Sequence, residues 1–151
     1  MGQDVLHHGV DIVDIDRIAQ AVTRWGNAFL QRVFTSQELV DANGRASSLA
    51  ARFAAKEATA KALGAGIQGI GAGLSGGVVA VGWRDIEVVR LPTGQPTLRL
   101  QGRAAERAAV LGWRSVSLSL SHARDAAIAS VVAIAAPEPD PAGATESRMV
   151  E

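Results

Sequence analysis

Residues 47–63, SSLAARFAAKEATAKAL, form the clearest helical pattern in the chain. Ser47 or Ser48 is a typical helix cap, and Gly64 follows where a helix commonly ends. On a helical wheel, Glu57 falls inside the arc of apolar and small side chains, and Lys61 lies beside that arc. A carboxylate on an apolar face needs a partner, because burying it unpaired is costly or shifts its pKa. This helix therefore predicts both a central structural element and a candidate site.

Two interpretations of Glu57 are open from periodicity alone. In the first, Glu57 and Lys61 form an ordinary surface ion pair at i, i+4 spacing. In the second, Glu57 binds a metal ion and Lys61 binds a phosphate beside it. Arg52 and Lys56 lie well off the apolar arc, on another side of the predicted helix.

The predicted first strand, residues 5–13, contains an acidic residue where an apolar one is expected. Asp11 interrupts the run GVDIV, and Asp14 and Asp16 are better placed to cap the helix that follows. If the helix of residues 47–63 crosses this strand, Asp11 and Glu57 converge. Two carboxylates in a chain without cysteine suit a hard cation such as Mg²⁺. His7 and His8 point to opposite faces of a strand and do not predict a metal pair.

The remaining pattern alternates irregularly between helices and hairpins, which favours an α+β fold over a doubly wound sheet. One helix is expected to run up to Trp25, where Gly26 stops it. A second is expected over 27–42, with Ser36 capping its latter half, and a further one over 102–111. Strands are expected at 78–82, 84–91, 96–101, 115–121 and 126–135. The Gly-rich stretch 64–77 is expected to be a mobile connection that borders an active site.

Several common sites are excluded by their context. The stretch from Gly64 to Gly69 matches G-x-G-x-x-G, but a helix precedes it and a strand follows, the reverse of a dinucleotide-binding site. The chain has neither a P-loop nor the G-x-S-x-G motif of serine hydrolases. His122 follows a strand of alternating serines and is, by itself, more typical of a structural hydrogen bonder.

Composition and charge place the chain among globular proteins. It has 151 residues, of which 48% are apolar and 20% charged, and it has no cysteine for a disulfide or thiolate site. The formal net charge of zero combines a body of residues 1–136 at +3 with a tail of residues 137–151 at −3. We expect one domain over 1–136 and a disordered acidic tail over 137–151. No targeting or membrane segment is evident, so we expect a cytoplasmic protein with no membrane or nucleic-acid partner.

Four ordered motifs resemble those of the holo-acyl-carrier-protein synthases, the small branch of the 4′-phosphopantetheinyl transferases. The resemblance covers most of residues 8–135. The motifs are Gly9-Val10-Asp11-Ile12-Val13 followed by Asp16-Arg17-Ile18; Arg52-Phe53-Ala54-Ala55-Lys56-Glu57-Ala58 followed by Lys61-Ala62-Leu63-Gly64; Asp85-Ile86-Glu87-Val88 followed by Gly94-Gln95-Pro96; and Leu118-Ser119-Leu120-Ser121-His122. The second motif is the most specific, and it favours the metal-binding interpretation of Glu57.

The resemblance implies a reaction: transfer of 4′-phosphopantetheine from coenzyme A to a serine of apo-acyl carrier protein, with 3′,5′-ADP as the other product. It implies an antiparallel sheet packed against a long central helix, and a homotrimer with active sites between subunits. The resemblance implies that Asp11 and Glu57 bind Mg²⁺ and that Lys61 contacts the transferred phosphate. It implies contacts near the 3′-phosphate and nucleotide by Arg52, Ser121 and His122, and an adenosine-binding wall formed by Phe53, Gly94, Gln95 and Pro96. It also implies that Arg17 and Arg24 dock the acidic carrier protein.

Some features depart from the family pattern or are left without a role. Gln95 replaces the usual basic residue, and the Gly-rich region is longer than in many relatives. Lys56 has a place in the motif but no predicted function. A carrier of fatty acid biosynthesis is the default partner, and a polyketide synthase carrier is the alternative. The rival hypothesis for the whole protein is a non-catalytic module that binds coenzyme A or another nucleotide.

Overall fold

The computed structural model describes residues 2–68 and 79–137. Its helices are α1 (Ile15–Trp25), α2 (Asn27–Val33), α3 (Ser36–Ala42), α4 (Ala46–Ala62), the 3₁₀ helix η1 (Trp83–Asp85) and α5 (Gly102–Val110). Its strands are β1 (Val5–Asp14), β2 (Gly66–Ile67), β3 (Ala80–Val81), β4 (Ile86–Arg90), β5 (Pro96–Leu100), β6 (Trp113–His122) and β7 (Ala126–Ala135). None of the helices in these ranges is long and apolar enough to cross a membrane.

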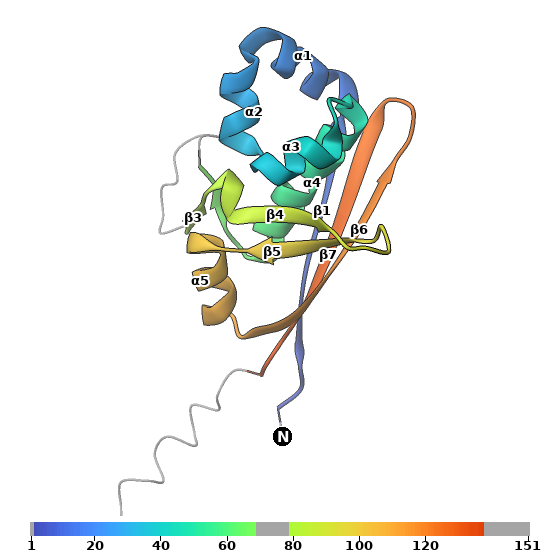
Figure 1. Cartoon of the computed structure of the whole chain (residues 1–151). Helices are drawn as coiled ribbons and strands as arrows, with labels where there is room; N and C mark the ends of the chain where they lie inside the picture. Colours follow the sequence, from blue (N-terminus) through green and yellow to red (C-terminus); the bar gives the residue numbers. More distant parts are fainter. Residues whose placement is uncertain (1, 69–78, 138–151) are drawn as a thin grey trace, which may run out of the picture.

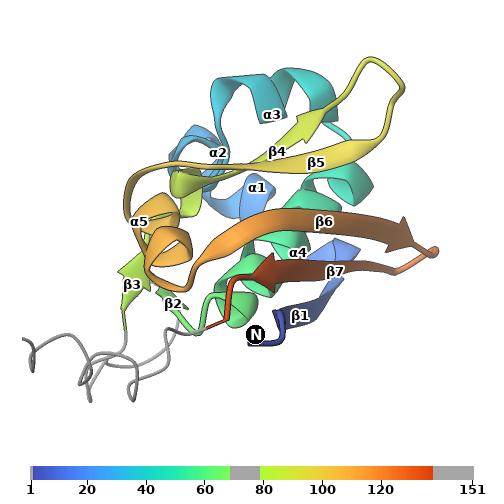
Figure 2. The same cartoon turned by 90° about the horizontal axis from the view of Figure 1, so that it is seen from below.

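A three-stranded antiparallel sheet in the order β1-β7-β6 packs against α4, as Figures 1 and 2 show. Small side chains on β7 make this close packing feasible: Ala127, Ala129, Val131 and Ala133 alternate along the strand and are fully buried. The antiparallel hairpin β4–β5 lies on the other side of α4, and α1 to α3 cover one end of the molecule. The predicted α+β class and the central helix are confirmed.

Helix α4 is buried on nearly every side, which corrects the prediction of a single apolar face. Arg52 is only 7% exposed, and Lys56 is fully buried although it lies away from the apolar arc. The reason is that α4 lies between the sheet and the β4–β5 hairpin, so both faces meet protein. The predicted serine cap is also wrong, because α4 begins at Ala46 without a side-chain cap, and Ser48 instead accepts a hydrogen bond from Arg52.

The predicted helical segment 27–42 is two helices. The chain is extended at Phe34, and Thr35 caps α3 in place of Ser36. The Thr35 hydroxyl accepts from the Glu38 backbone N–H at 3.2 Å, and the Glu38 carboxylate accepts from the Thr35 N–H at 3.0 Å. This reciprocal capping box provides acceptors for donors at the helix start that would otherwise be unpaired.

The region between α4 and β4 also differs from the prediction. The strand expected at 84–91 begins at Ile86, because η1 occupies Trp83–Asp85 and the Asp85 carboxylate accepts from the Gly82 N–H at 2.9 Å. The described part of the strand expected at 78–82 is the short β3, which pairs in parallel with β2. Most of the predicted Gly-rich connection and most of the predicted tail lie outside the described residues.

Candidate active site

Asp11 and Lys61 meet where α4 crosses β1. The Lys61 ammonium donates to the Asp11 carboxylate and to the Val10 carbonyl, both at 3.0 Å. The Asp11 side chain is only 10% exposed, whereas that of Lys61 is 58% exposed, so the lysine reaches this position from the solvent side. Glu57 lies one helical turn before Lys61 on α4, and burial together with the neighbouring Asp11 carboxyl group raises the pKa of Glu57, so the two carboxyl groups lie close together. The structure therefore brings together Asp11 and Glu57, as predicted, and places Lys61 beside them.

Gly9 allows this close approach of strand and helix. A Cβ atom at this position would lie 1.8 Å from the Ala58 carbonyl oxygen and 2.9 Å from the Ala62 nitrogen, both backbone atoms of α4. Only a residue without a side chain fits here. Asp11 follows two residues later on the same face of β1, so Gly9 sets the distance between the Asp11 carboxylate and the α4 side chains.

The electrostatics of the carboxylate pair suit a divalent cation. Burial, followed by the neighbouring Asp11 carboxyl group, raises the pKa of Glu57 from its ordinary value to about 7, while the positive charges of Arg17 and Lys61 oppose the rise. The Asp11 Oδ2 atom is buried and has no hydrogen-bond partner among the described residues. An unpaired buried carboxylate oxygen is costly unless it is compensated by another group. Oxygen ligands of this kind fit Mg²⁺, which needs few protein carboxylates and keeps sites for other oxygens.

A second site lies on the far edge of the sheet. We call it the arginine hollow, a cavity of about 320 Å³ that includes Arg45, Arg52, Arg90, Gly94, Pro96, Ser121 and His122 in its lining. Arg52 is nearly buried here, and its Nε atom has no partner among the described residues. A buried guanidinium with two other arginines and a histidine nearby is suited to a phosphate group. Five of the predicted nucleotide-site residues thus meet, whereas Gln95 does not line the cavity.

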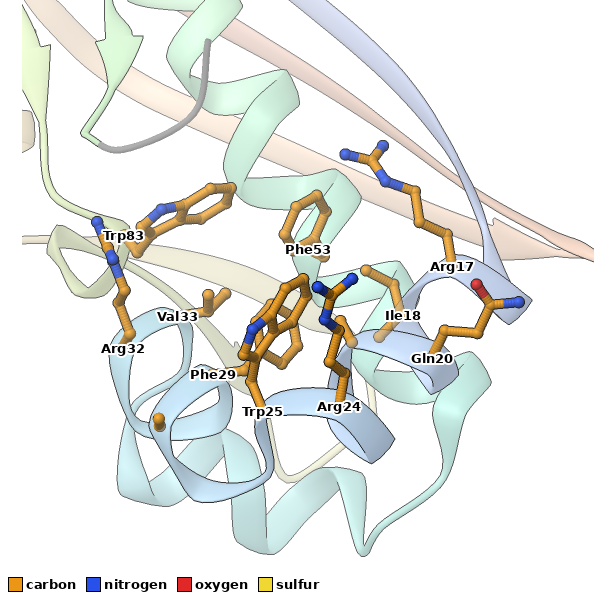
Figure 3. Close-up of a pocket in the computed structure, with 12 residues that line it drawn as sticks. Arg17, Ile18, Gln20, Arg24, Trp25, Phe29, Arg32, Val33, Phe53 and Trp83 are labelled. Carbon is orange, nitrogen blue, oxygen red and sulfur yellow. The ribbon is translucent and has the colours of Figure 1, made fainter.

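A third site is the helical hollow, a cavity of about 580 Å³ (Figure 3). Its apolar lining includes Ile18, Phe29, Val33, Phe53 and Trp83, and its polar lining includes Arg17, Arg24 and Arg32. The Phe53 and Trp83 rings stack with centroids 4.7 Å apart. Phe53 therefore lies apart from the turn of Gly94 and Pro96 within one chain, although both were assigned to one adenosine-binding wall.

Comparison with known proteins agrees with this arrangement. A family model described as the 4′-phosphopantetheinyl transferase superfamily matches residues 8–131. The holo-[acyl-carrier-protein] synthase of Herpetosiphon aurantiacus is 55% identical over 124 residues, which cover 82% of this chain and 94% of the relative.

The chain belongs to the 4′-phosphopantetheinyl transferase superfamily.

Solved structures of this superfamily share the fold. That of the holo-[acyl-carrier-protein] synthase from Helicobacter pylori in complex with coenzyme A has a TM-score of 0.68 and 34% identity, covering 83% of this chain and 98% of that one. A coenzyme A complex from Chronobacterium ammoniagenes has a TM-score of 0.71 and 31% identity, covering 87% and 98%. The α+β architecture derived above is thus the architecture of phosphopantetheinyl transferases.

Sequence reasoning missed several residues of this transferase's cavities. Arg45 and Arg90 line the arginine hollow but lie outside every quoted motif. Arg32 and the half-exposed Trp25 border the helical hollow with the predicted Arg17 and Arg24. Periodicity shows that Arg17 and Arg24 share a face of α1, but it does not reveal that α2 folds back to add Arg32 to the same rim.

Proposed function

We propose that Asp11, Glu57 and Lys61 form the reaction centre of a holo-acyl-carrier-protein synthase. The protein transfers 4′-phosphopantetheine from coenzyme A to a serine of apo-acyl carrier protein, and 3′,5′-ADP leaves. The observation that carries the assignment of this centre is the convergence of two carboxylates and one lysine, with the Asp11 Oδ2 atom buried and unpaired among the described residues. Asp11 and Glu57 would hold Mg²⁺, which would stabilise charge on the phosphate oxygens during transfer.

Lys61 and Glu57 have distinct proposed roles besides metal binding. The exposed Lys61 ammonium, anchored by Asp11 and the Val10 carbonyl, points its charge where a phosphate can approach from solvent. Without a metal, the raised pKa of Glu57 lets it keep a proton near neutral pH, and binding of Mg²⁺ would displace that proton. A carboxylate bound to Mg²⁺ is a poor base, so a water molecule beside it would take the proton of the carrier serine. Phosphoryl chemistry depends mostly on such positioning and electrostatic stabilisation.

The arginine hollow supports a proposal for the nucleotide end of coenzyme A. Arg45, Arg52 and Arg90 present three cationic side chains around one cavity, and His122 adds a ring nitrogen. Guanidinium groups bind phosphate through paired hydrogen bonds, so the 3′-phosphate of coenzyme A fits this cavity. The turn of Gly94 and Pro96 supplies an uncharged wall for the adenosine.

The helical hollow supports a proposal for carrier-protein docking. Arg17, Arg24 and Arg32 give it a basic border around an apolar floor, which is complementary to an acidic protein surface with an apolar side chain to bury. Arg17 also acts electrostatically on Glu57, so the hollow opens beside the reaction centre. A carrier bound there would present its serine close to Lys61 and Glu57.

An exposed apolar sheet face supports a homotrimer. The residues that form it on paired strands are Leu6, Val10 and Ile12 of β1 and Ile128, Val132 and Ile134 of β7. Ile12 is 68% exposed and Leu6 is 67% exposed, and soluble monomers rarely leave such a contiguous surface in water. The reaction centre and the arginine hollow lie at β1 and β6, the opposite edges of the sheet, with β7 between them. In the proposed trimer, the arginine hollow of one copy faces the reaction centre of another.

One experiment tests the proposed reaction centre and the rival binding function together. Apo carrier protein incubated with coenzyme A, Mg²⁺ and the enzyme should gain the mass of phosphopantetheine. The Glu57→Gln variant should give no gain while remaining folded and still binding coenzyme A. If the wild-type protein binds coenzyme A but modifies no carrier, the non-catalytic module is favoured. If Glu57→Gln turns over normally, Glu57 does not belong to the metal site.

A further inference from the structure

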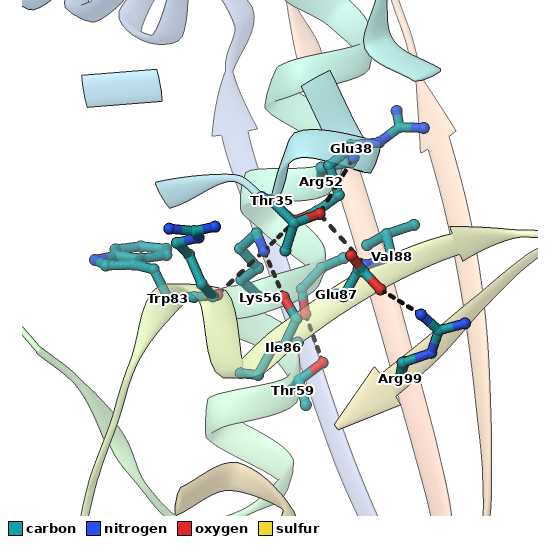
Figure 4. Close-up of polar contacts among 12 residues, drawn as sticks. Thr35, Glu38, Arg52, Lys56, Thr59, Trp83, Ile86, Glu87, Val88 and Arg99 are labelled. Carbon is teal, nitrogen blue, oxygen red and sulfur yellow. Dashed lines mark hydrogen bonds and ion pairs between the residues drawn. The ribbon is translucent and has the colours of Figure 1, made fainter. Parts of the chain in front are cut away.

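Lys56 and Glu38 form an ion pair that is enclosed in the protein interior (Figure 4). Both side chains have zero exposure, and the Lys56 ammonium donates to Glu38 Oε1 at 2.7 Å. The ammonium also donates to the carbonyl oxygens of Trp83, at 3.1 Å, and Ile86. A lysine has three donors, and all three are used here.

Glu38 links the same centre to two further backbone segments. Its Oε1 atom accepts from the Thr35 N–H at 3.0 Å, and its Oε2 atom accepts from the Val88 N–H at 3.3 Å. The pair therefore ties together the start of α3, the middle of α4, η1 and β4, as Figure 4 shows. None of these atoms touches the reaction centre or lines the arginine hollow.

Stability alone is a weak explanation for such a pair. Removing two charges from water is costly, and well-packed apolar residues often stabilise a protein as much as a buried ion pair does. What apolar residues cannot do is bind two particular carbonyl groups and hold their peptide planes in place. One of these carbonyls belongs to Trp83, whose ring stacks on Phe53 in the lining of the helical hollow.

We propose that Lys56 and Glu38 are a positioning pair that holds Trp83 against Phe53 and so shapes the helical hollow. The pair also anchors Thr35, which directly follows α2 and Phe34, so the α2 wall of the hollow is held from the same centre. Lys56 thereby acts on the binding of the carrier protein without touching it. The inference rests on the proposed role of the helical hollow as the docking site.

The double variant Glu38→Gln/Lys56→Met tests this role. A single substitution leaves an uncompensated buried charge and lowers stability, whereas the double variant is neutral and retains an acceptor for the Thr35 N–H. The matched control is Thr59→Val, because Thr59 is equally buried on α4 but bonds only to the Ala55 carbonyl of its own helix. In the double variant, KM for the carrier should rise about tenfold, with kcat and KM for coenzyme A within about twofold of wild type.

A second measurement separates positioning from docking. In protein labelled with 5-fluorotryptophan, the ¹⁹F resonance of Trp83, assigned with Trp83→Phe, should shift in the double variant and stay in place in Thr59→Val. An unchanged Trp83 resonance, or an unchanged carrier KM in the folded double variant, would overturn the inference. If replacing Arg17 and Arg24 by glutamate leaves carrier binding intact, the docking proposal fails. The Trp83 resonance then still decides whether the Lys56–Glu38 pair positions the ring.

Discussion

Replacing Gly9 by alanine tests the strand–helix contact on which the proposed reaction centre depends. The added methyl group would lie 1.8 Å from the Ala58 carbonyl oxygen and 2.9 Å from the Ala62 nitrogen. Both are backbone atoms of α4, so no side-chain rotation can relieve the clash. Strand β1 and helix α4 must separate by about 1.2 Å to restore a 3.0 Å contact. Overpacking costs about 1–3 kcal/mol and sometimes more. We expect about 3 kcal/mol of lost stability, because the clash is with backbone.

Two assays measure the effect. For a chain of this size about 1 kcal/mol changes Tm by about 2–4 °C, so Gly9→Ala should melt about 6–12 °C below wild type. At a temperature where the variant is folded, turnover should fall about a hundredfold, because displacement of Asp11 by about 1 Å misaligns the centre.

Gly44→Ala is the matched control for this substitution. Unlike Gly9, Gly44 has a left-handed backbone, at φ +70°, and a Cβ there meets nothing within 4 Å, so the control adds a methyl group and backbone strain but no clash. This control should lose about 1 kcal/mol and keep full activity. If Gly9→Ala melts within about 2 °C of wild type and retains turnover, the close contact between β1 and α4 is refuted.

Four further predictions concern the sites and the assembly. Because the folded protein raises the pKa of Glu57 to about 7, metal-free protein should lose stability relative to Glu57→Gln as pH rises from about 4.5 to about 7; parallel melting curves in EDTA would disprove this. Glutamates at Arg17 and Arg24 should raise KM for the carrier and flatten its salt dependence while leaving KM for coenzyme A unchanged. Arg52→Met should raise KM for coenzyme A about tenfold, but that for dephospho-coenzyme A by less than about twofold, in steady-state assays. Ile12→Asp should lower the mass measured by light scattering from trimer to monomer, and an unchanged mass would argue against the sheet face as the interface.

The two carboxylates of the proposed reaction centre stood out in the sequence because each breaks a local pattern, and the family resemblance then assigned them, with Lys61, to one site. Asp11 is a charge in an apolar strand, and Glu57 is a charge inside an apolar helical arc. Such exceptions are visible in a single sequence, since burying an unpaired carboxylate is costly. The convergence of Asp11 and Glu57 was a hypothesis that required α4 to cross β1, and the structure confirms that crossing and adds Lys61 beside Asp11.

Other features escaped prediction because they depend on what packs around a segment. A helical wheel separates one face from another but does not reveal that α4 is enclosed on both, so the burial of Lys56 was missed. The break between α2 and α3 follows from a capping box whose Glu38 carboxylate is also bound by Lys56, which lies 18 residues later. Local propensity contains no information about such a partner.

By itself, the sequence determined which residues alternate into strands and helices, and which acidic, basic and glycine residues stand at motif spacing. These properties depend on neighbours within a few positions of the chain, so they can be inferred from periodicity and side-chain chemistry. The tertiary structure alone decided that Gly9 lies against the α4 backbone, that Arg45 and Arg90 join Arg52, and that Lys56 is buried with Glu38. Each of these depends on contacts between segments far apart in the chain, where the packing of the whole core determines distance and burial.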